Sequence, residues 1–140
     1  MRVMGPQVFH NPVVVIFCHS RAELLEAAIQ SFIAAEDSES WSLVVIQQIG
    51  HHEVDSVLQK YTKEIDYLHS FLPVSDHYLA NINHSRLTGW EIAFTDLESN
   101  FVIGIEEDTS IARDALIFSK FVFLKYASHP RFRGINFTSF

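Results

Sequence analysis

Apolar runs alternate with segments of helical periodicity along this chain, which predicts that strands and helices follow one another. Residues 13–18 and 43–46 are uninterrupted apolar runs rich in β-branched side chains, as is typical of parallel strands buried on both faces. Apolar residues then recur at helical spacing over residues 21–36 and 53–63. A third run, residues 65–71, alternates imperfectly, so we expect its strand at an edge of the sheet.

The second half of the chain continues the same order of elements. Residues 85–98 are apolar nearly all round and predict a helix, in which Gly89 permits close packing against a neighbour. Residues 101–105 predict another buried strand, residues 112–127 a helix, and residues 132–137 a last strand. This order predicts an α/β fold, in which a mostly parallel sheet carries helices on both faces within one domain that spans the chain.

Two local patterns predict a helix start and a connection. Ser20 lies three residues before Glu23, and this Ser-x-x-Glu spacing predicts a capping box at the start of the first helix. Residues 73–83 predict a loop or a short helical turn.

The strand predicted at residues 101–105 stops abruptly at an acidic triplet. Glu106, Glu107 and Asp108 follow it directly, and crowded carboxylates repel one another at a place where a strand has no structural need for them. A divalent cation relieves such repulsion, because hard oxygen ligands bind Mg²⁺ and Mn²⁺ well. Ligands of α/β proteins also bind at the carboxyl edge of the sheet. The pattern therefore favours a metal-assisted ligand site.

A structural role for the same stretch is an open alternative. Asp108, Thr109 or Ser110 would then cap the following helix, and Asp114 would interact favourably with its dipole. The ends of two other strands favour the ligand site, because His19-Ser20-Arg21 and Gln47-Gln48 should reach the same edge of a parallel sheet.

Composition narrows the classes of partner. A formal net charge of -7 argues against nonspecific binding to nucleic acid or to an anionic membrane, although a metal can bridge the protein to a phosphate. Cys18 is the single cysteine, so an internal disulfide is excluded and a reducing compartment is favoured. The apolar run that ends at Cys18 is too short to cross a membrane or to form a signal-peptide core, so we expect a cytoplasmic protein.

Several enzyme classes are disfavoured by motifs that the sequence lacks. It has no Gly-x-Gly-x-x-Gly after the first strand, no phosphate-binding Gly-x-x-x-x-Gly-Lys-Ser/Thr loop and no Gly-x-Ser-x-Gly elbow. Cys18 stands at a strand end, where a nucleophile could lie. A small buried hydrophobic residue is the better interpretation, because nothing beside Cys18 in the sequence lowers its pKa.

The chain resembles the nucleotide-sugar-binding half of GT-A fold glycosyltransferases, closest to the N-acetylglucosaminyltransferase I type. Residues 13–21, VVVIFCHSR, resemble the first strand of that family and its Cys-Asp-Arg-Ser turn. Residues 45–51, VIQQIGH, resemble the second strand and its Ser-Gln-Asp-x-Gly-His end. Residues 102–114 resemble the Glu-Asp-Asp motif, a variant of Asp-x-Asp, with the helix after it. His84-Ser85-Arg86 matches a His-x-Arg helix start more loosely.

The resemblance implies a Rossmann-like N-terminal half of a GT-A fold that binds a UDP- or GDP-sugar with Mn²⁺ or Mg²⁺. Asp108 would be the metal ligand, and the cation would stabilise the diphosphate as the glycosidic bond breaks. Arg21 or Arg86 would add charge-assisted bonds to phosphate. The residues implied in nucleotide-sugar binding are Cys18, His19, Ser20, Arg21, Gln48, Arg86, Glu106 and Glu107.

The sequence departs from the family at three acidic positions. His19 and Gln48 replace acids of the first and second strand ends, and Glu107 replaces the middle Asp of the motif. The preference of the site for one nucleotide base, uracil or guanine, therefore stays open. In the resembled family the acceptor pocket and the catalytic base lie beyond the segment matched here. An inverting transfer needs such a base, and we assign none.

Two other functions compete with glycosyl transfer. The first is a GT-A-like binding or interaction module without activity, or a truncated relative that lacks the acceptor half. The second, ranked last, is a receiver domain, which needs an acid pair after the first strand and a Lys at the last strand. This sequence has neither feature at the positions predicted for those strands.

A truncated sheet would leave an apolar edge uncovered, so we expect a homodimer or a partner chain, which sedimentation can test.

Overall fold

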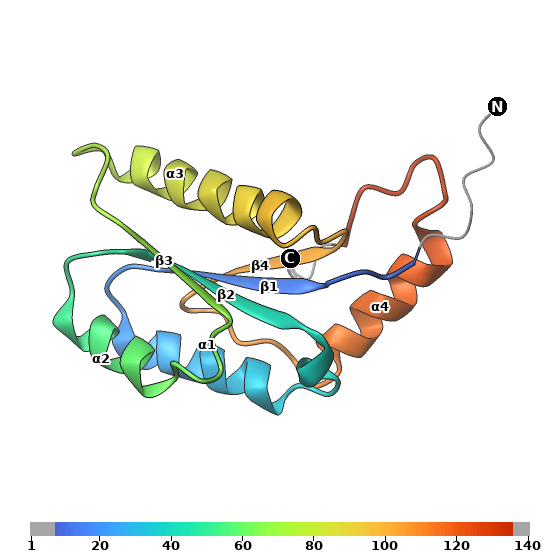
Figure 1. Ribbon diagram of the computed structural model, residues 1–140, viewed down its shortest axis with the longest axis horizontal. Coiled ribbons are helices and arrows are strands. Elements are labelled where there is room, and N and C mark those ends of the chain that lie inside the picture. Colours follow the sequence, from blue (N-terminus) through green and yellow to red (C-terminus); the bar gives the residue numbers. More distant parts are fainter. Residues whose placement is uncertain (1–7, 136–140) are drawn as a thin grey trace.

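Four parallel strands form one sheet with helices on both faces in the computed structural model, which describes residues 8–135 (Figure 1). The strands lie in the order β3-β2-β1-β4. In chain order the elements are β1 (Val13–Cys18), α1 (Ala22–Ala34), β2 (Ser42–Gln48), α2 (His52–Lys60), β3 (Tyr67–Phe71), α3 (Tyr78–Glu91), β4 (Val102–Glu106) and α4 (Ala115–Tyr126).

The predicted α/β class, with a parallel Rossmann-like sheet, is confirmed. β1 lies at the centre, where Phe17 is in register with Ile46 of β2 and Glu106 of β4. Both central strands are apolar runs because helices cover them from both sides, which leaves no water-facing side for polar residues. The strand that alternates imperfectly, β3, lies at an edge, as predicted.

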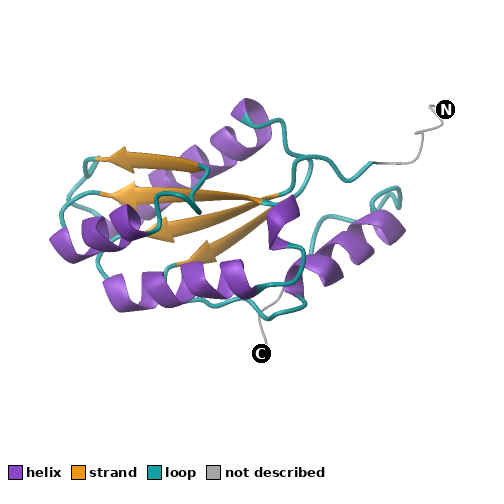
Figure 2. Ribbon diagram, turned by 60° about the horizontal axis from the view of Figure 1, so that its bottom comes forward, coloured by secondary structure: helices purple, strands orange, loops and turns teal. Residues whose placement is uncertain are grey.

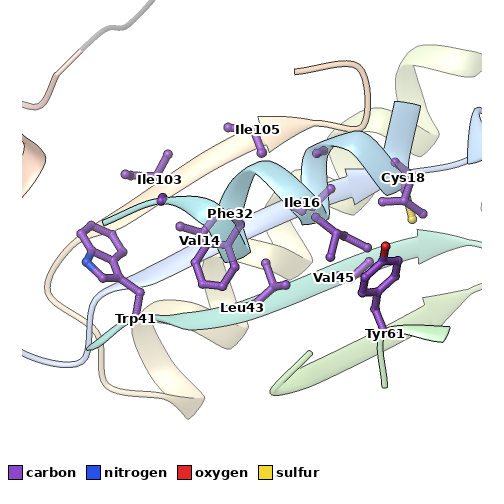
Figure 3. Packing of buried hydrophobic residues seen from close by; sticks show 14 of the residues in the cluster. Val14, Ile16, Cys18, Phe32, Trp41, Leu43, Val45, Tyr61, Ile103 and Ile105 are labelled. Carbon is purple, nitrogen blue, oxygen red and sulfur yellow. The ribbon is translucent and has the colours of Figure 1, made fainter. Parts of the chain in front are cut away.

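Alternation along the strands builds two hydrophobic cores. Side chains such as Val14 and Ile16 face α1 and α2, where they pack in one cluster with Phe32 and Leu43 (Figure 3). The intervening side chains, such as Val15, face α3 and the π-helical turn that follows it, Ile92–Asp96. Figure 2 shows helices on either side of the sheet. Because successive side chains of a strand point to opposite faces, a residue's position in its strand decides which helix it meets.

α3 lies close to the sheet because Gly89 faces it. A Cβ atom at Gly89 would lie 2.7 Å from Cε1 of Phe17, closer than real Cβ contacts, and 3.0 Å from Cγ1 of Val15, which is tighter than most of them. The prediction that this glycine permits close packing is therefore confirmed.

An aromatic cluster lies at the opposite end of the sheet from the acidic triplet. Phe9, Trp41 and Phe101 precede three of the strands, and Phe123 reaches them from α4. The ring of Phe123 lies 5.3 Å from that of Phe9 and 5.5 Å from that of Phe101, centroid to centroid. These contacts hold α4 beside the amino ends of the strands.

Helix starts were the least accurate predictions. α3 begins at Tyr78, inside the stretch predicted as a loop or short turn, because Asn81 ties the preceding chain to it. The Asn81 amide accepts the N–H of Val74 at 2.8 Å and donates to the carbonyl of Ser75 at 2.8 Å. The capping box is wrong: Arg21, not Ser20, precedes the first helical residue, and no side chain caps α1.

The acidic stretch does not cap the next helix either. α4 begins at Ala115 with Asp114 before it, several residues beyond Asp108, Thr109 and Ser110. The last strand, predicted at residues 132–137, is absent from residues 132–135, and its remainder lies outside the described residues.

Candidate functional site

Strand alternation separates the members of the acidic triplet. Glu106 is the last residue of β4 and lies on the face that carries α3. Glu107 points the other way, toward the start of α1, and its N–H donates to the carbonyl of Phe17 at 3.0 Å. This bond extends the β1–β4 pairing by one residue, so the alternation continues through the triplet.

Glu107 joins the ends of β1 and β4. Its side chain is 5% exposed, and Oε2 accepts the backbone N–H groups of His19 at 2.8 Å and Arg21 at 3.4 Å. Oε1 accepts Nε of Arg21 at 3.1 Å. Both carboxylate oxygens therefore have protein partners, and the buried charge is paired, as a buried carboxylate requires.

The Arg21 guanidinium lies between two acids. Besides Glu107, it donates from Nη1 to Oδ2 of Asp108 at 2.8 Å. The hydrogen bonds to Glu107 and then to Asp108 raise the pKa of Arg21 above its ordinary value. Arg21 is thus engaged by acids of its own chain, and it is a weaker candidate for a phosphate ligand than the sequence indicated.

Glu106 pairs with an arginine of α3. Nη2 of Arg86 donates to Oε1 of Glu106 at 2.8 Å, and the side chains are 50% and 42% exposed. Both groups are open to water, so the pair can exchange Glu106 for a bound anion at little cost in stability. Two guanidinium groups compensate two of the three negative charges, which leaves one net negative charge among these five side chains.

Most of the predicted ligand residues line one small cleft of about 80 Å³ between the carboxyl ends of β1, β2 and β3 and helix α3. Its wall includes five residues that the sequence indicated, whereas Ser20, Arg21, Glu107 and Asp108 are not part of it. Those five are Cys18, His19, Gln48, Arg86 and Glu106.

A second, larger cavity of about 910 Å³ lies along β4, on the side away from β1. It shares Phe17, Arg86 and Glu106 with the smaller cleft, so the Arg86–Glu106 pair stands between the two. Among residues 8–135, no strand pairs with this outer side of β4. The prediction of a homodimer or a partner chain is not tested by a single chain and stays a prediction.

The two glutamines at the end of β2 have different roles. The buried Gln47 donates from its amide nitrogen to Oδ1 of Asp55 in α2 and accepts the hydroxyl of Ser70 at 2.9 Å. Sequence analysis grouped it with Gln48 among the polar groups of the ligand edge, although alternation in β2 would have placed it on the α2 face. Gln48 lies on the opposite face, toward α3, and lines the cleft.

Histidine and cysteine side chains complete the edge. The rings of His19 and His51 meet edge to face, with centroids 4.8 Å apart. Cys18 is 5% exposed and packs within the core, as predicted for a small hydrophobic residue. Burial, followed by the nearby charges of Glu107 and Asp55, raises the pKa of its thiol well above the ordinary value, so it is not a nucleophile at neutral pH.

The donor set fits a divalent cation only together with a ligand. In the part of the chain that the structure describes, no three His, Cys, Asp or Glu side chains form a metal-binding group. Asp108 offers a carboxylate that is 42% exposed, whereas Glu107 is buried and fully engaged. Mg²⁺ sites often have one or two protein carboxylates, with substrate phosphates and water as the other ligands. The arrangement is therefore compatible with a cation that arrives with a diphosphate.

None of the helices in residues 8–135 has the length and apolar character needed to cross a lipid bilayer. The cytoplasmic location stays a prediction.

The fold is similar to that of solved glycosyltransferase structures. The crystal structure of S. aureus TarS residues 1–349 matches with a TM-score of 0.62 at 13% identity, over 90% of this chain and 38% of that chain. A second crystal structure of S. aureus TarS matches with a TM-score of 0.64 at 14% identity, over 90% of this chain and 23% of that chain. No protein-family model and no curated protein sequence matches the chain.

At this level of identity the likeness concerns the fold alone. TarS is a glycosyltransferase, and the likeness supports a GT-A-like glycosyltransferase fold. It does not support the closer resemblance to the N-acetylglucosaminyltransferase I type. The chain spans less than two fifths of the TarS chains that it matches.

Proposed function

We propose that this chain is the donor-binding part of a glycosyltransferase, and that it binds a nucleoside-diphosphate sugar at the carboxyl edge of its sheet. The observation that carries the proposal is the cleft beside α3, where His19, Gln48, Arg86 and Glu106 come together from four elements of a GT-A-like fold. Ligands of open parallel sheets bind at this edge. The donor would be a UDP- or GDP-sugar, and the transferred group a hexosyl or N-acetylhexosaminyl residue.

Arg86 is the best candidate for a phosphate ligand. Its guanidinium is half-exposed at the wall of the cleft and is held by one exposed carboxylate, so a diphosphate oxygen can replace Glu106 as its partner. Arg21, held by both Glu107 and Asp108, would instead keep the two strand ends in place.

Charge favours binding together with Mn²⁺ or Mg²⁺. The five charged side chains carry one net negative charge, and a diphosphate alone would be repelled by them. Asp108, which is open to water, would hold the cation. A divalent cation in this position would neutralise the diphosphate and stabilise the nucleoside diphosphate as it leaves.

The proposal is tested by calorimetric titration of the full chain with UDP and with GDP, each with and without Mn²⁺. We expect tight binding only in the presence of the cation, and an affinity at least tenfold lower for Asp108→Ala. Asp114→Ala is the matched control, because it removes an exposed acid from the start of α4. Binding that is unaffected both by chelation and by Asp108→Ala would contradict the metal-assisted site.

A binding module without activity is the second candidate. It is favoured by the lack of an assignable catalytic base among the described residues. Incubation of the chain with UDP- and GDP-sugars and Mn²⁺, followed by assay of the released nucleoside diphosphate, separates the two. Release above the rate of Asp108→Ala would support an enzyme, whereas binding without release would support the module.

A further inference from the structure

We propose that the outer face of α4 docks on an anionic membrane surface. Ile117, Phe121 and Leu124 lie at positions i, i+4 and i+7, so they form one stripe along the helix. Their exposed fractions are 43%, 58% and 55%, which makes this an apolar stripe open to water in the described part of the chain. We call it the α4 stripe.

The stripe cannot turn inward, because the other face of α4 is already buried. Leu116 and Ser119 are fully buried, and Phe123 is fixed in the aromatic cluster with Phe9 and Phe101. A helix that is apolar on both faces is typically buried on both faces. In the described part of the chain only the inner face of α4 is covered by protein.

Lysines flank the stripe on both sides. On a helical projection of 100° per residue, Lys120 lies on one side of Ile117, Phe121 and Leu124, and Lys125 on the other. Both ammonium groups lie over aromatic rings, Lys120 over Phe9 at 5.9 Å and Lys125 over Phe121 at 5.6 Å. Lysines that border an apolar stripe can extend their long side chains to lipid headgroups while the stripe contacts the acyl region.

Charge along the chain is distributed unevenly around this helix. Residues 111–135 hold five of the ten Lys and Arg residues of the chain, and only one of its seventeen Asp and Glu residues, Asp114. Arg113 is paired with Glu36, so the remaining four Lys and Arg residues and Asp114 leave this segment with a local excess of three positive charges. The net charge of the whole chain predicts no attraction to an anionic membrane, but electrostatic attraction falls off within a Debye length, so the local charge matters. Two copies of such a basic face would repel each other, which favours anionic lipid over a second copy as the occupant.

Docking through α4 is compatible with the proposed donor site and does not depend on it. α4 packs on residues that precede β1 and β4, whereas the cleft lies at the carboxyl ends of the strands (Figure 1). A membrane on the α4 stripe would therefore leave the acidic edge accessible from water.

The test is co-sedimentation of the full chain with vesicles of phosphatidylcholine alone and of phosphatidylcholine with phosphatidylglycerol at 3:1. We expect binding to the anionic vesicles only, and its loss at 0.5 M NaCl, a salt concentration chosen to shorten the Debye length to about 4 Å. Binding to neither vesicle would overturn the proposal, as would equal binding to both.

Two pairs of variants separate docking from misfolding. Lys120→Gln with Lys125→Gln should weaken binding about fivefold for each lysine, and Phe121→Ser with Leu124→Ser by roughly tenfold or more. The matched controls, Lys63→Gln and Leu87→Ser, change an exposed lysine and an exposed leucine elsewhere and should bind like the unaltered chain. Equal losses in the controls would overturn the proposal. So would a sedimentation shift from dimer to monomer in the Phe121→Ser, Leu124→Ser variant without vesicles, since the stripe would then be a protein interface.

Discussion

The Glu107 carboxylate accepts the backbone N–H of His19 at 2.8 Å, although the two residues lie 88 positions apart in the chain. With Arg21 bound to the same carboxylate, the turn after β1 is tied to the end of β4. The family resemblance placed Glu107 among the donor-binding residues. In the structure, Glu107 holds together the two strand ends that form this edge of the site.

Replacing Glu107 should destabilise the fold. We expect Glu107→Ala to lower the free energy of unfolding by roughly 2–4 kcal/mol, because the part-buried N–H groups of His19 and Arg21 and the Arg21 guanidinium lose their acceptor. Denaturant unfolding measures this change. Asp108→Ala is the comparison, since its more exposed carboxylate contributes one ion pair and its loss should cost under about 1 kcal/mol. Equal losses in the two variants would show that Glu107 has no special structural role.

Replacing Arg86 should weaken nucleotide binding while leaving the stability of the fold nearly unchanged. Arg86→Gln removes an exposed ion pair, so the free energy of unfolding should change by less than about 1 kcal/mol. The affinity for UDP or GDP with Mn²⁺ should fall roughly tenfold, because a hydrogen bond to a charged phosphate is lost. Arg113→Gln, which breaks the exposed pair with Glu36, is the control for calorimetry. Unchanged nucleotide affinity in Arg86→Gln would argue against a phosphate at this position.

Adding one methyl group at Gly89 should loosen α3 from the sheet. We expect Gly89→Ala to lower the free energy of unfolding by about 1 kcal/mol, since overpacking against Phe17 outweighs the gain in helix propensity. Asn83→Ala, at an exposed position of the same helix, should be neutral or slightly stabilising. Thermal unfolding of both variants tests this, and a more stable Gly89→Ala protein would be the contrary result.

The Cys18 thiol should react only when the chain unfolds. Its pKa is raised by burial, so at pH 8 a thiol reagent should modify the native protein at the rate of unfolding and the denatured protein within seconds. The unfolded thiol releases its proton as pH rises past its ordinary value of 9.0, while the folded thiol keeps it. Cys18 thus leaves stability unchanged below that pH and lowers it above. Unfolding of the Cys18→Ala variant at pH 7 and pH 10 provides the reference.

Sequence analysis predicted the architecture well because the fold rests on strong, local patterns. The uninterrupted apolar runs of β1 and β2 require burial on both faces, and their order with the helices fixes a parallel sheet. The start of α3 was missed because the bonds that fix it come from the Asn81 side chain, which leaves no mark in apolar spacing.

Sequence analysis predicted that the polar strand ends gather at one edge of the sheet, but it did not predict how their side chains pair. Sequence reasoning brought Glu106, Glu107 and Asp108 to the edge where His19 and Gln48 also lie, and the structure places them there. It treated the acids as one group in need of a cation. Strand alternation would have shown that Glu106 and Glu107 face different helices. Their charges are compensated by Arg21 from the turn after β1 and by Arg86 from α3, and this depends on tertiary packing, which the sequence pattern does not contain.

The opposite orientations of Glu106 and Glu107 make the length of β4 as important to the site as its composition. A deletion or insertion of one residue between Phe101 and Glu106 would rotate the triplet by one position of the pleat. An insertion would place Ile105 beside Arg86 and Glu106 under the β1 turn, whereas a deletion would place Glu107 beside Arg86 and Asp108 under the turn. In both cases the present pairing of acids with arginines would be lost. Relatives of this chain that keep the edge functional should accordingly vary the loops around β4 and preserve the spacing within it.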